Sequence, residues 1–496
     1  MLESVERKVI EPQALGKLTP DEIFDYLGKE LFDKTDKEIQ DFLLKTAFLP
    51  KMTAKMAEDL TGLSPASRIL DTLSRTHYFS EKRFHGKPIY QYHLLFREFL
   101  LSRAKETFSR EDQSILLHRA AILLEDSGQT EEAVVLLSET GRWSEVVELI
   151  RKHAPAMLQH GRNRSLAEWL EILPRGILED NPWLLYWMGE CQAPFDIQLG
   201  QFYFEKAFEK FRTEEGRVGI FLAWAGVVNS IINEYRDFTP LDKWIAVLGE
   251  LMGTSGSFPS EEVSLRVSSV MLLALEMRHP HHPEIEKWVE RVLTLSESCP
   301  NISEKIMGYA RLAYYWIQMG EFPKGVMAIH RLRQLSRQRN IPPVRLITAN
   351  FHESIYNRFA GLHEECLKTV SAGLEQSQKI GSYPVYNWLL IHGIASSLNV
   401  HDLETANALL EKLTVSLNRN KPWETNLYYL LRAREALARG KPGEAAIHVE
   451  MANKFAGQVG APNSLFIFNI VKAHVMHQLN KHQEADSQYF HCCRSG

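Results

Sequence analysis

A repeat of about 40 residues in the C-terminal part of the chain limits its possible folds more than any other feature. The related stretches QMGEFPKGV, RFAGLHEEC, LNVHDLETA, ARGKPGEAA and QLNKHQEAD begin at Gln318, Arg358, Leu398, Ala438 and Gln478. Four of them carry a glutamate in register, and Lys324 breaks the series in the first: Glu364, Glu404, Glu444 and Glu484. A period of this length is typical of helix pairs that stack into a solenoid.

The residue types in the repeat have a simple physical explanation. A small residue lets the chain turn where one helix ends. The glutamate then lies in the first turn of the next helix, where it favours the positive end of the helix dipole. An alanine lets that helix pack closely on the preceding one. An earlier copy, SGQTEEA, carries Gly128, Glu132 and Ala133, and pairs such as Glu131-Glu132 read as helix starts.

The N-terminal part of the chain has a different pattern. Helical spacing in MTAKMAEDLTGLSPASRILDTLSRTHYF is interrupted at Thr61-Gly62-Leu63, which predicts a helix-turn-helix. The following FSEKRFHGKPIYQYH reads as two strands around His85-Gly86-Lys87. A helix-turn-helix followed by a β-hairpin is a winged helix.

These patterns predict a mostly α protein in which a winged helix precedes a tetratricopeptide-like α-superhelix. We expect a linker over residues 1–18, a winged helix over 19–108, a first superhelical part over 109–300 and repeats over 301–496. The linker-like start and the stop soon after a helical pattern suggest a chain that is truncated, at the C-terminus in particular.

Composition excludes several classes of protein. The net charge of −5 argues against a nucleic-acid-coating protein. No apolar run reaches the ~18 residues that span a bilayer, and the charged N-terminus is unlike a signal peptide. Five scattered cysteines without a CxxC pair predict a reduced, cytoplasmic protein.

The order of three stretches resembles a known family. TPDEIFDYLGKELFDKTDKEIQDFLLKTAFLPKMTAKMAEDLTG, YQYHLLFREFLLSRA and LHRAAILLEDSGQTEEAVVLLSETGRWSEVVELI look like the middle of bacterial ATP-dependent transcriptional regulators of the maltose-regulon-activator type. In these signal-transduction ATPases, a P-loop ATPase precedes the winged helix, a superhelical sensor follows it, and an output domain ends the chain. The resemblance is specific over about residues 19–240.

The chain departs from that family in one important respect. It contains no GxxxxGK[ST], so the family's ATP hydrolysis is not assigned to it, and an output domain is also missing. There is no GxSxG or HExxH motif either. The histidines of HPHHPE (His279, His281, His282) and of the C-terminal tail lack the spacing of a zinc site. We therefore expect no enzyme activity, no metal and no cofactor.

His93 is a candidate nucleotide sensor by resemblance. In related signalling ATPases a histidine late in the winged helix reaches the bound nucleotide, and His93 in YQYHLLF is the matching position. Its ligand would come from an ATPase module outside this chain. The alternative is a histidine that only ends a strand against the next helix.

Two further groups of residues are candidates for binding. Residues 68–105 hold eight lysines and arginines against three acidic residues, the sign that phosphate contacts need. The candidates for DNA contact are Arg68, Arg75, Lys82, Arg83 and Lys87. The aromatic cluster Trp183, Tyr186 and Trp187 is either helix packing or a ligand platform on the concave face of the solenoid.

The resemblance and the repeat together predict a non-enzymatic sensor region. It would receive a small inducer or a protein partner on the superhelix and pass that state to an ATPase module in cis or in trans, reaching DNA only indirectly and no membrane. Two alternatives stay open: a pure protein-interaction scaffold, and a DNA-binding regulator that uses its own winged helix.

Overall fold

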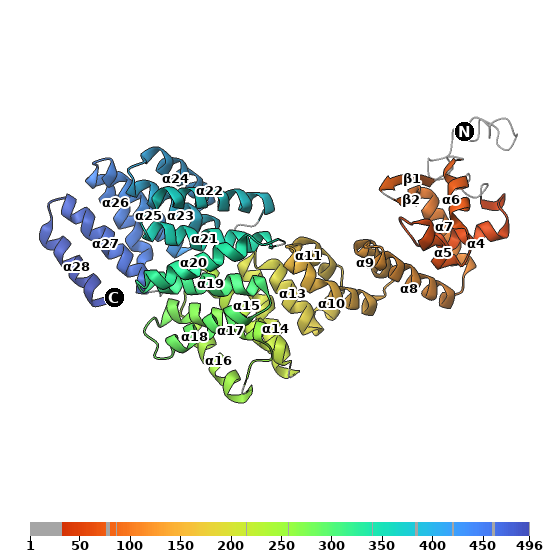
Figure 1. Ribbon diagram of the computed structural model, residues 1–496, viewed down its shortest axis with the longest axis horizontal. Helices are drawn as coiled ribbons and strands as arrows, with labels where there is room; N and C mark the ends of the chain where they lie inside the picture. The colour runs from red at the N-terminus through yellow and green to blue at the C-terminus, as the bar shows by residue number, and fades with distance from the viewer. Residues whose placement is uncertain are drawn as a thin grey trace. The chain divides into compact units, whose positions relative to one another are not determined.

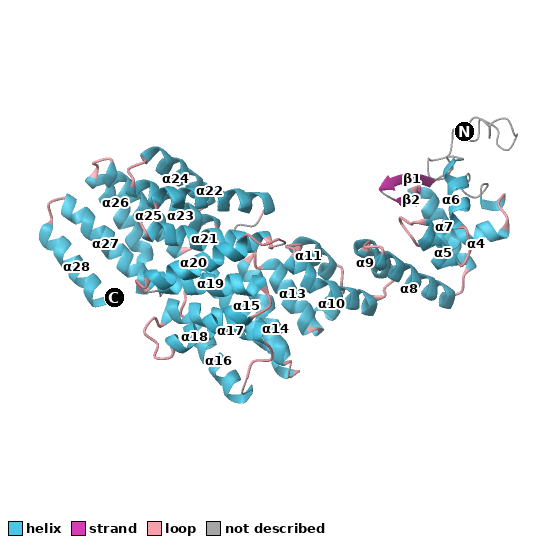
Figure 2. Cartoon of the chain, in the orientation of Figure 1, coloured by secondary structure: helices cyan, strands magenta, loops and turns pink. Residues whose placement is uncertain are grey.

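The computed structural model describes residues 32–75, 80–85, 87–214, 216–255, 257–339, 341–381, 385–418, 421–458 and 462–495. This part of the chain is helical almost throughout, with one two-stranded sheet (Figures 1 and 2), which confirms the prediction of a mostly α protein. The chain divides into two compact units, residues 1–152 and 153–496. The expected linker over residues 1–18 lies outside the described residues.

The first unit contains the predicted winged helix. Its elements are α4 (Lys37–Thr46), α5 (Ala54–Thr61), α6 (Ala66–Arg75), β1 (Ser80–His85), β2 (Lys87–Tyr92) and α7 (Leu94–Thr107). The turn after α5 uses Gly62 at φ 78°, a left-handed conformation that glycine adopts without a steric penalty. The two strands pair antiparallel from Ser80 opposite Tyr92 to His85 opposite Lys87. The helix-turn-helix and the β-hairpin are thus confirmed.

Two tyrosines of β2 attach the β-hairpin to the helices. The Tyr90 hydroxyl donates to Asp71 Oδ1 of α6 at 2.6 Å. The Tyr92 hydroxyl lies 2.7 Å from Thr46 Oγ1, and burial of this pair raises the pKa of Tyr92. Both tyrosines are buried, as are the apolar side chains of Phe42 and Leu100 in the same unit. Three helices follow in the chain: α8 (Arg110–Asp126), α9 (Thr130–Glu139) and α10 (Trp143–Gln159).

The second unit is built from consecutive helices. They are α11 (Asn163–Glu171), α12 (Arg175–Asp180), α13 (Pro182–Gln192), α14 (Ile197–Thr213), α15 (Arg217–Glu234), α16 (Leu241–Ser255), α17 (Glu261–Arg278), α18 (Ile285–Ser298), α19 (Ile302–Gln318), α20 (Phe322–Ser336), α21 (Pro343–Phe359), α22 (His363–Ile380), α23 (Tyr386–Asn399), α24 (Leu403–Ser416), α25 (Pro422–Ala438), α26 (Pro442–Ala456), α27 (Pro462–Gln478) and α28 (His482–Ser495). None of the described helices is long and apolar enough to cross a membrane.

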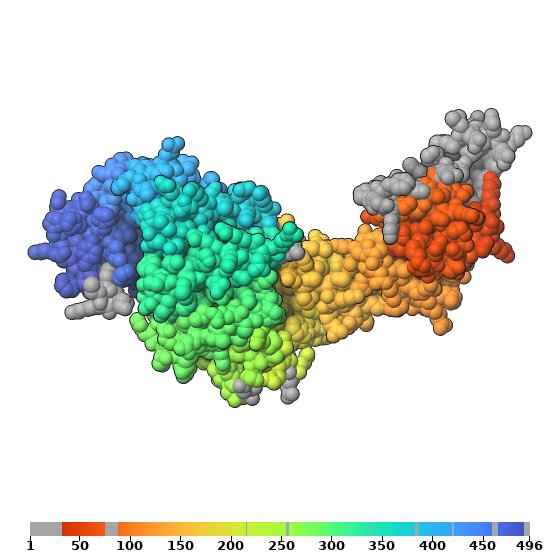
Figure 3. Space-filling view, viewed as in Figure 1, coloured from red at the N-terminus to blue at the C-terminus, as the bar shows by residue number. Residues whose placement is uncertain are grey.

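From α13 onward these helices form antiparallel pairs that stack in chain order. Each first helix, from α13 to α27 by odd number, contacts its own partner, and each from α13 to α25 also contacts the first helix of the next pair. The first helices therefore form one continuous inner layer. In the space-filling view the colours run through the second unit in chain order, as this stacking requires (Figure 3). The prediction of a tetratricopeptide-like array is confirmed.

The turns of the 40-residue repeat share one backbone conformation. Positive φ angles occur at Gly320, Gly361, His401, Gly440 and Asn480, one at each turn between the paired helices. The amide that follows each of them donates to the carbonyl five residues earlier, at 2.8–2.9 Å. This is the Schellman arrangement, which satisfies carbonyls at the helix end. The predicted small residue is present at three of the five turns, and asparagine or histidine takes its place at the other two.

The rest of the repeat also lies where its physical explanation predicts. Glu364, Glu404, Glu444 and Glu484 are each in the first turn of a helix. The alanines that follow, at Ala406, Ala445 and Ala485, are fully buried. Close packing of the two helices of a pair therefore depends on a small side chain at this position, where the other two copies have Gly325 and Cys366.

Candidate ligand site on the inner helices

A cavity lies on the inner layer of the second unit. Its walls come from α15, α17, α19, α21 and α23 and from the start of α25, and it offers about 90 Å³ to water-sized molecules. Six of its side chains carry the polar atoms that matter here: Arg311, His352, Arg358, Trp388, His392 and Trp423. We call this space, together with the side chains that line it, the inner cavity. Residues more than 100 positions apart in the chain thus meet in one place.

Each of these six side chains has a buried polar atom without a hydrogen-bond partner among the described residues. The atoms are Nε of Arg311 and Arg358, Nε1 of Trp388 and Trp423, Nε2 of His352 and Nδ1 of His392. Buried polar groups are nearly always hydrogen-bonded, because leaving one unpaired costs about 1–3 kcal/mol. Six such atoms gather around one cavity, which makes it the candidate ligand site.

Burial and the two arginines determine the charge state of the cavity. Burial lowers the pKa of Arg358, with help from the positive charge of Arg434, to about 10. It also lowers the pKa of Arg311. Both guanidinium groups stay charged at neutral pH. Burial, reinforced by Arg311, lowers the pKa of His352 to about 3, so this imidazole is neutral.

The neutral histidine has a defined tautomer. His352 Nδ1 lies 2.8 Å from the carbonyl oxygen of Thr348, and a carbonyl oxygen can only accept a hydrogen bond. Nδ1 therefore carries the proton, and Nε2 presents a lone pair. The inner cavity thus combines N–H donors of the arginines and tryptophans with an acceptor at His352 Nε2.

Aromatic rings hold these polar groups in place. The ring centroids of Trp388 and Trp423 are 5.3 Å apart in an edge-to-face arrangement, and Tyr235 lies 4.6 Å from Trp388. The ring of Phe351 lies 5.7 Å from that of His392. Edge-to-face packing fixes ring orientation, so the indole N–H groups have little freedom to find other partners.

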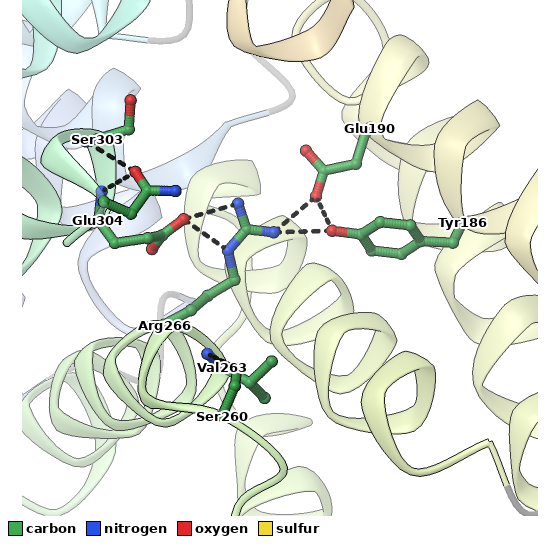
Figure 4. Close-up of polar contacts among 8 residues, drawn as sticks. Tyr186, Glu190, Ser260, Val263, Arg266, Ser303 and Glu304 are labelled. Atoms are coloured by element: carbon green, nitrogen blue, oxygen red, sulfur yellow. Dashed lines mark hydrogen bonds and ion pairs between the residues drawn. The ribbon is translucent and has the colours of Figure 1, made fainter. Parts of the chain in front are cut away.

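A third arginine on the inner layer, Arg266, differs from the two in the inner cavity because it forms ion pairs with carboxylates (Figure 4). Arg266 Nη2 lies 3.0 Å from Glu304 Oε1. Its Nη1 donates to the hydroxyl of Tyr186 at 2.7 Å and lies 3.4 Å from Glu190 Oε1. We call this group the Arg266 cluster. The cluster connects α13, α17 and α19, and its ion pairs hold these three helices together.

One residue of the predicted aromatic platform, Tyr186, belongs to the Arg266 cluster. Tyr186 is buried and donates to Glu190 Oε1 at 2.7 Å. Trp187 is also buried, and the half-buried Trp183 packs 5.8 Å from it and 5.1 Å from Phe211. The three residues lie on one helix, α13, as their spacing suggests. Their contacts are those of helix packing, and ligand binding by them stays a prediction.

The candidates in the winged helix are only partly described. His93 is exposed and occupies the N-cap position of α7, without a side-chain cap. Arg68 is exposed on α6. The side chains of Arg75, Lys82, Arg83 and Lys87 lie outside the described residues, although their backbone belongs to α6, β1 and β2. A role in nucleotide sensing or DNA contact stays a prediction for each.

The residues of the inner cavity were not predicted from the sequence, although a signal was present. Arg311, His352 and His392 each lie nine residues before a residue of positive φ, namely Gly320, Gly361 and His401. They therefore occupy one position of the repeat, on three successive first helices. Polar residues recurring at one repeat position indicate a shared surface.

Metal binding has no support in the described part of the chain. No group of three or more histidine, cysteine, aspartate or glutamate side chains is arranged there to hold a metal ion. His279 of the HPHHPE stretch lies 2.9 Å from Asp242 through its Nε2, which accounts for that histidine as a surface contact.

Comparison with known proteins agrees with this architecture. Residues 28–113 match the MalT winged helix domain. The HTH-type transcriptional regulators MalT of Cronobacter sakazakii and Yersinia pestis are 28% and 26% identical over 182 and 181 residues. Each alignment covers 36% of this chain and 20% of the relative, so it spans about a fifth of the length of these regulators.

A solved structure shows the same fold over most of the chain. It is a signal transduction ATPase with numerous domains from Pyrococcus horikoshii, with a tetratricopeptide repeat sensor. The two share 13% identity at a TM-score of 0.56, over 87% of this chain and 64% of that one. In its winged helix and in the stacked helix pairs that follow, this chain is similar to the corresponding region of MalT-type transcriptional regulators.

Proposed function

We propose that this chain is the sensor region of a signal-transducing transcriptional regulator and that it receives a small-molecule inducer in the inner cavity. The observation that carries the proposal is the set of six buried polar atoms without protein partners around that cavity. The named tetratricopeptide sensor of the Pyrococcus protein supports it at the level of the fold. The signal would pass to an ATPase module in cis or in trans, and DNA would be reached indirectly.

The position of the cavity suggests how binding could be transmitted. Its walls come from successive first helices, so a ligand there contacts several helix pairs at once. Such a ligand stabilises the relative angles at which these pairs stack. It shifts the population between two arrangements by its difference in affinity for them, and by no more. At a hundred times its Kd it also raises stability by about 2.7 kcal/mol.

A thermal-shift screen of the full chain against a bacterial metabolite extract tests the proposal. We expect a fraction of the extract to raise Tm in the wild type. The response should be lost in Trp423→Phe, which removes one unpartnered N–H but keeps an aromatic ring. Trp183→Phe is the matched control, because Trp183 also lies on a first helix and outside the inner cavity.

The two variants also separate the inner cavity from the predicted aromatic platform. If Trp183→Phe loses the response and Trp423→Phe keeps it, the ligand binds at α13 and not in the inner cavity. A Tm that no fraction changes would overturn the small-molecule proposal and favour the alternative, a scaffold that binds only other proteins.

The DNA-binding alternative has one specific observation in its favour. Arg68 is exposed on the second helix of the helix-turn-helix, where residues that read a DNA groove are found. If the full chain binds duplex DNA, its affinity should fall as the salt concentration rises. Arg68→Gln should make that fall shallower, by the amount that corresponds to about one lost phosphate contact. Absence of binding at low ionic strength would remove this alternative.

A further inference from the structure

The inner cavity carries a further inference about the chemical class of its ligand. We propose that the cavity selects a small organic anion that also bears a hydroxyl group. The inference rests on the proposed sensor function and adds the ligand's charge and hydrogen-bonding pattern.

The charge of the ligand follows from the two arginines. In the described part of the chain, no carboxylate forms an ion pair with Arg311 or Arg358, whereas Arg266 on the neighbouring helix pairs with two. An uncompensated charge with a buried N–H costs stability, and folded proteins rarely keep one without a function. An anion in the cavity would receive charge-assisted hydrogen bonds from these groups.

The closest candidate for a protein counter-charge does not cancel Arg311. Glu276 on α17 is buried, and the electrostatic influence of Arg311 reaches it. No ion pair joins the two residues, and burial raises the pKa of Glu276 well above its usual range despite that arginine. Arg311 therefore has no ion-paired counter-charge among the described residues.

The two indoles reinforce the preference for an acceptor-rich group. Trp388 and Trp423 are 8% and 5% exposed, and each has a buried N–H without a partner. An indole N–H can only donate. Together with the arginine Nε–H groups, the cavity offers four donors to the oxygens of a carboxylate or phosphate.

The hydroxyl group follows from His352. Because its Nδ1 donates to the Thr348 carbonyl oxygen, its unpartnered Nε2 can only accept while the ring is neutral. A carboxylate has no proton to give, so a hydroxyl group on the ligand would supply the donor that this nitrogen requires. The cavity of about 90 Å³ suits a compact molecule and is too small for an extended oligosaccharide.

Calorimetric titration of the full chain with four matched probes tests this inference. The probes are glycerate, glycerol 3-phosphate, glycerol and propionate, which separate carboxylate, phosphate, neutral polyol and carboxylate without hydroxyl. We expect glycerate or glycerol 3-phosphate to bind at least about tenfold more tightly than glycerol and propionate. The stronger of the two identifies the anionic group.

Substitution of the two cavity arginines tests whether the anion binds in the inner cavity. Arg311→Gln and Arg358→Gln should each weaken binding of the anion about tenfold or more. Without ligand, both variants should be at least as thermostable as the wild type, because they remove an unpaired buried charge. Arg331→Gln, on the exposed side of α20, is the control and should bind like the wild type. Unchanged affinity in both cavity variants would overturn the assignment.

The remaining outcomes also decide the question. Glycerol binding as tightly as the anions would overturn the anionic class but leave the sensor function standing. Propionate binding as tightly as glycerate would overturn the hydroxyl requirement. No binding of either anion at millimolar concentration would overturn the inference, while the extract screen tests the sensor function independently.

Discussion

At the scale of single residues, two arginines of the inner layer differ in whether they have partners. Arg266 and Arg311 lie on successive first helices and are both cationic. The first has two carboxylates and a tyrosine hydroxyl as partners, and the second has a buried Nε without any. A paired buried charge is expensive to break, and an unpaired one is expensive to keep. The two arginines should therefore respond to substitution in opposite directions.

Replacing Arg266 should destabilise the second unit. Arg266→Gln would leave Glu190 and the buried Glu304 without their counter-charge. We expect a loss of about 2–3 kcal/mol, less than for a fully buried pair because the Arg266 side chain is 26% exposed. Urea unfolding measures this loss. Lys368→Gln breaks an exposed ion pair with Glu365 and should leave stability nearly unchanged.

His352 should make stability depend on pH. Its folded pKa of about 3 lies below the ordinary value of 6.5, so between these values the unfolded chain binds a proton that the folded chain excludes. Stability therefore falls as pH decreases through this window, by about 2 kcal/mol at pH 5 from His352. His392, whose pKa burial also lowers, acts in the same direction.

Thermal unfolding of His352→Gln checks this pH dependence. Between pH 7 and pH 5 the Tm of the variant should fall less steeply than that of the wild type. His330→Gln, at an exposed position of α20, is the control and should keep the wild-type slope. Equal slopes for the wild type and the His352 variant would show that another group governs acid sensitivity.

At the scale of elements, each turn of the repeat requires a particular backbone conformation more than a particular side chain. Gly361 and His401 occupy equivalent turns at φ 76° and 60°. A residue with a Cβ pays about 1–2 kcal/mol in this conformation. Histidine and asparagine are among the residues that tolerate it best, which explains why the pattern survives without glycine at two turns.

Exchanging these turn residues should change stability in opposite directions. Gly361→Ala should cost about 1 kcal/mol through the backbone alone, because a Cβ at this position would meet nothing within 4 Å. His401→Gly should gain up to about 1 kcal/mol. Gly249→Ala, in the interior of α16 with equally open surroundings, should be stabilising. Chemical denaturation of the three variants measures these differences, and a stabilising Gly361→Ala would contradict the requirement.

At the scale of the whole molecule, the second unit is a stack in which each helix pair contacts mainly its neighbours. Stability in such an array is close to a sum of the pairs and their interfaces. The inner cavity draws on the inner layer from α15 to the start of α25, and its last contributor along the chain is Trp423. Ligand binding should therefore depend on some of the helix pairs and tolerate loss of others.

Shortening the stack tests this expectation. Removal of residues 459–496, which takes away α27 and α28, should lower Tm because the buried faces of α25 and α26 lose their cover. The helical circular dichroism signal should fall only in proportion to length, and binding of the ligand found in the probe titration should persist. Removal of residues 421–496 also deletes Trp423 and should abolish binding. Collapse of all helical signal in the shorter deletion would show that the stack folds as one unit.

Local patterns in the sequence were sufficient for the winged helix and for the stacked helix pairs. Glycine, glutamate and alanine at fixed offsets define a turn, a helix start and a close contact, and each of these depends on only a few neighbouring residues. Alternating residues around Gly86 likewise predict the β-hairpin. Such features can be inferred from the sequence because their physical causes are local.

Only the tertiary structure decided where a ligand could bind. Whether the N–H of Trp423 or the Nε of Arg311 finds a partner depends on how helices more than 100 residues apart stack against one another. The sequence by itself determined that the chain stacks helix pairs. The stacking then determined which polar groups lost contact with water without gaining a protein partner, because desolvation depends on the whole surroundings of an atom and not on its position in a repeat.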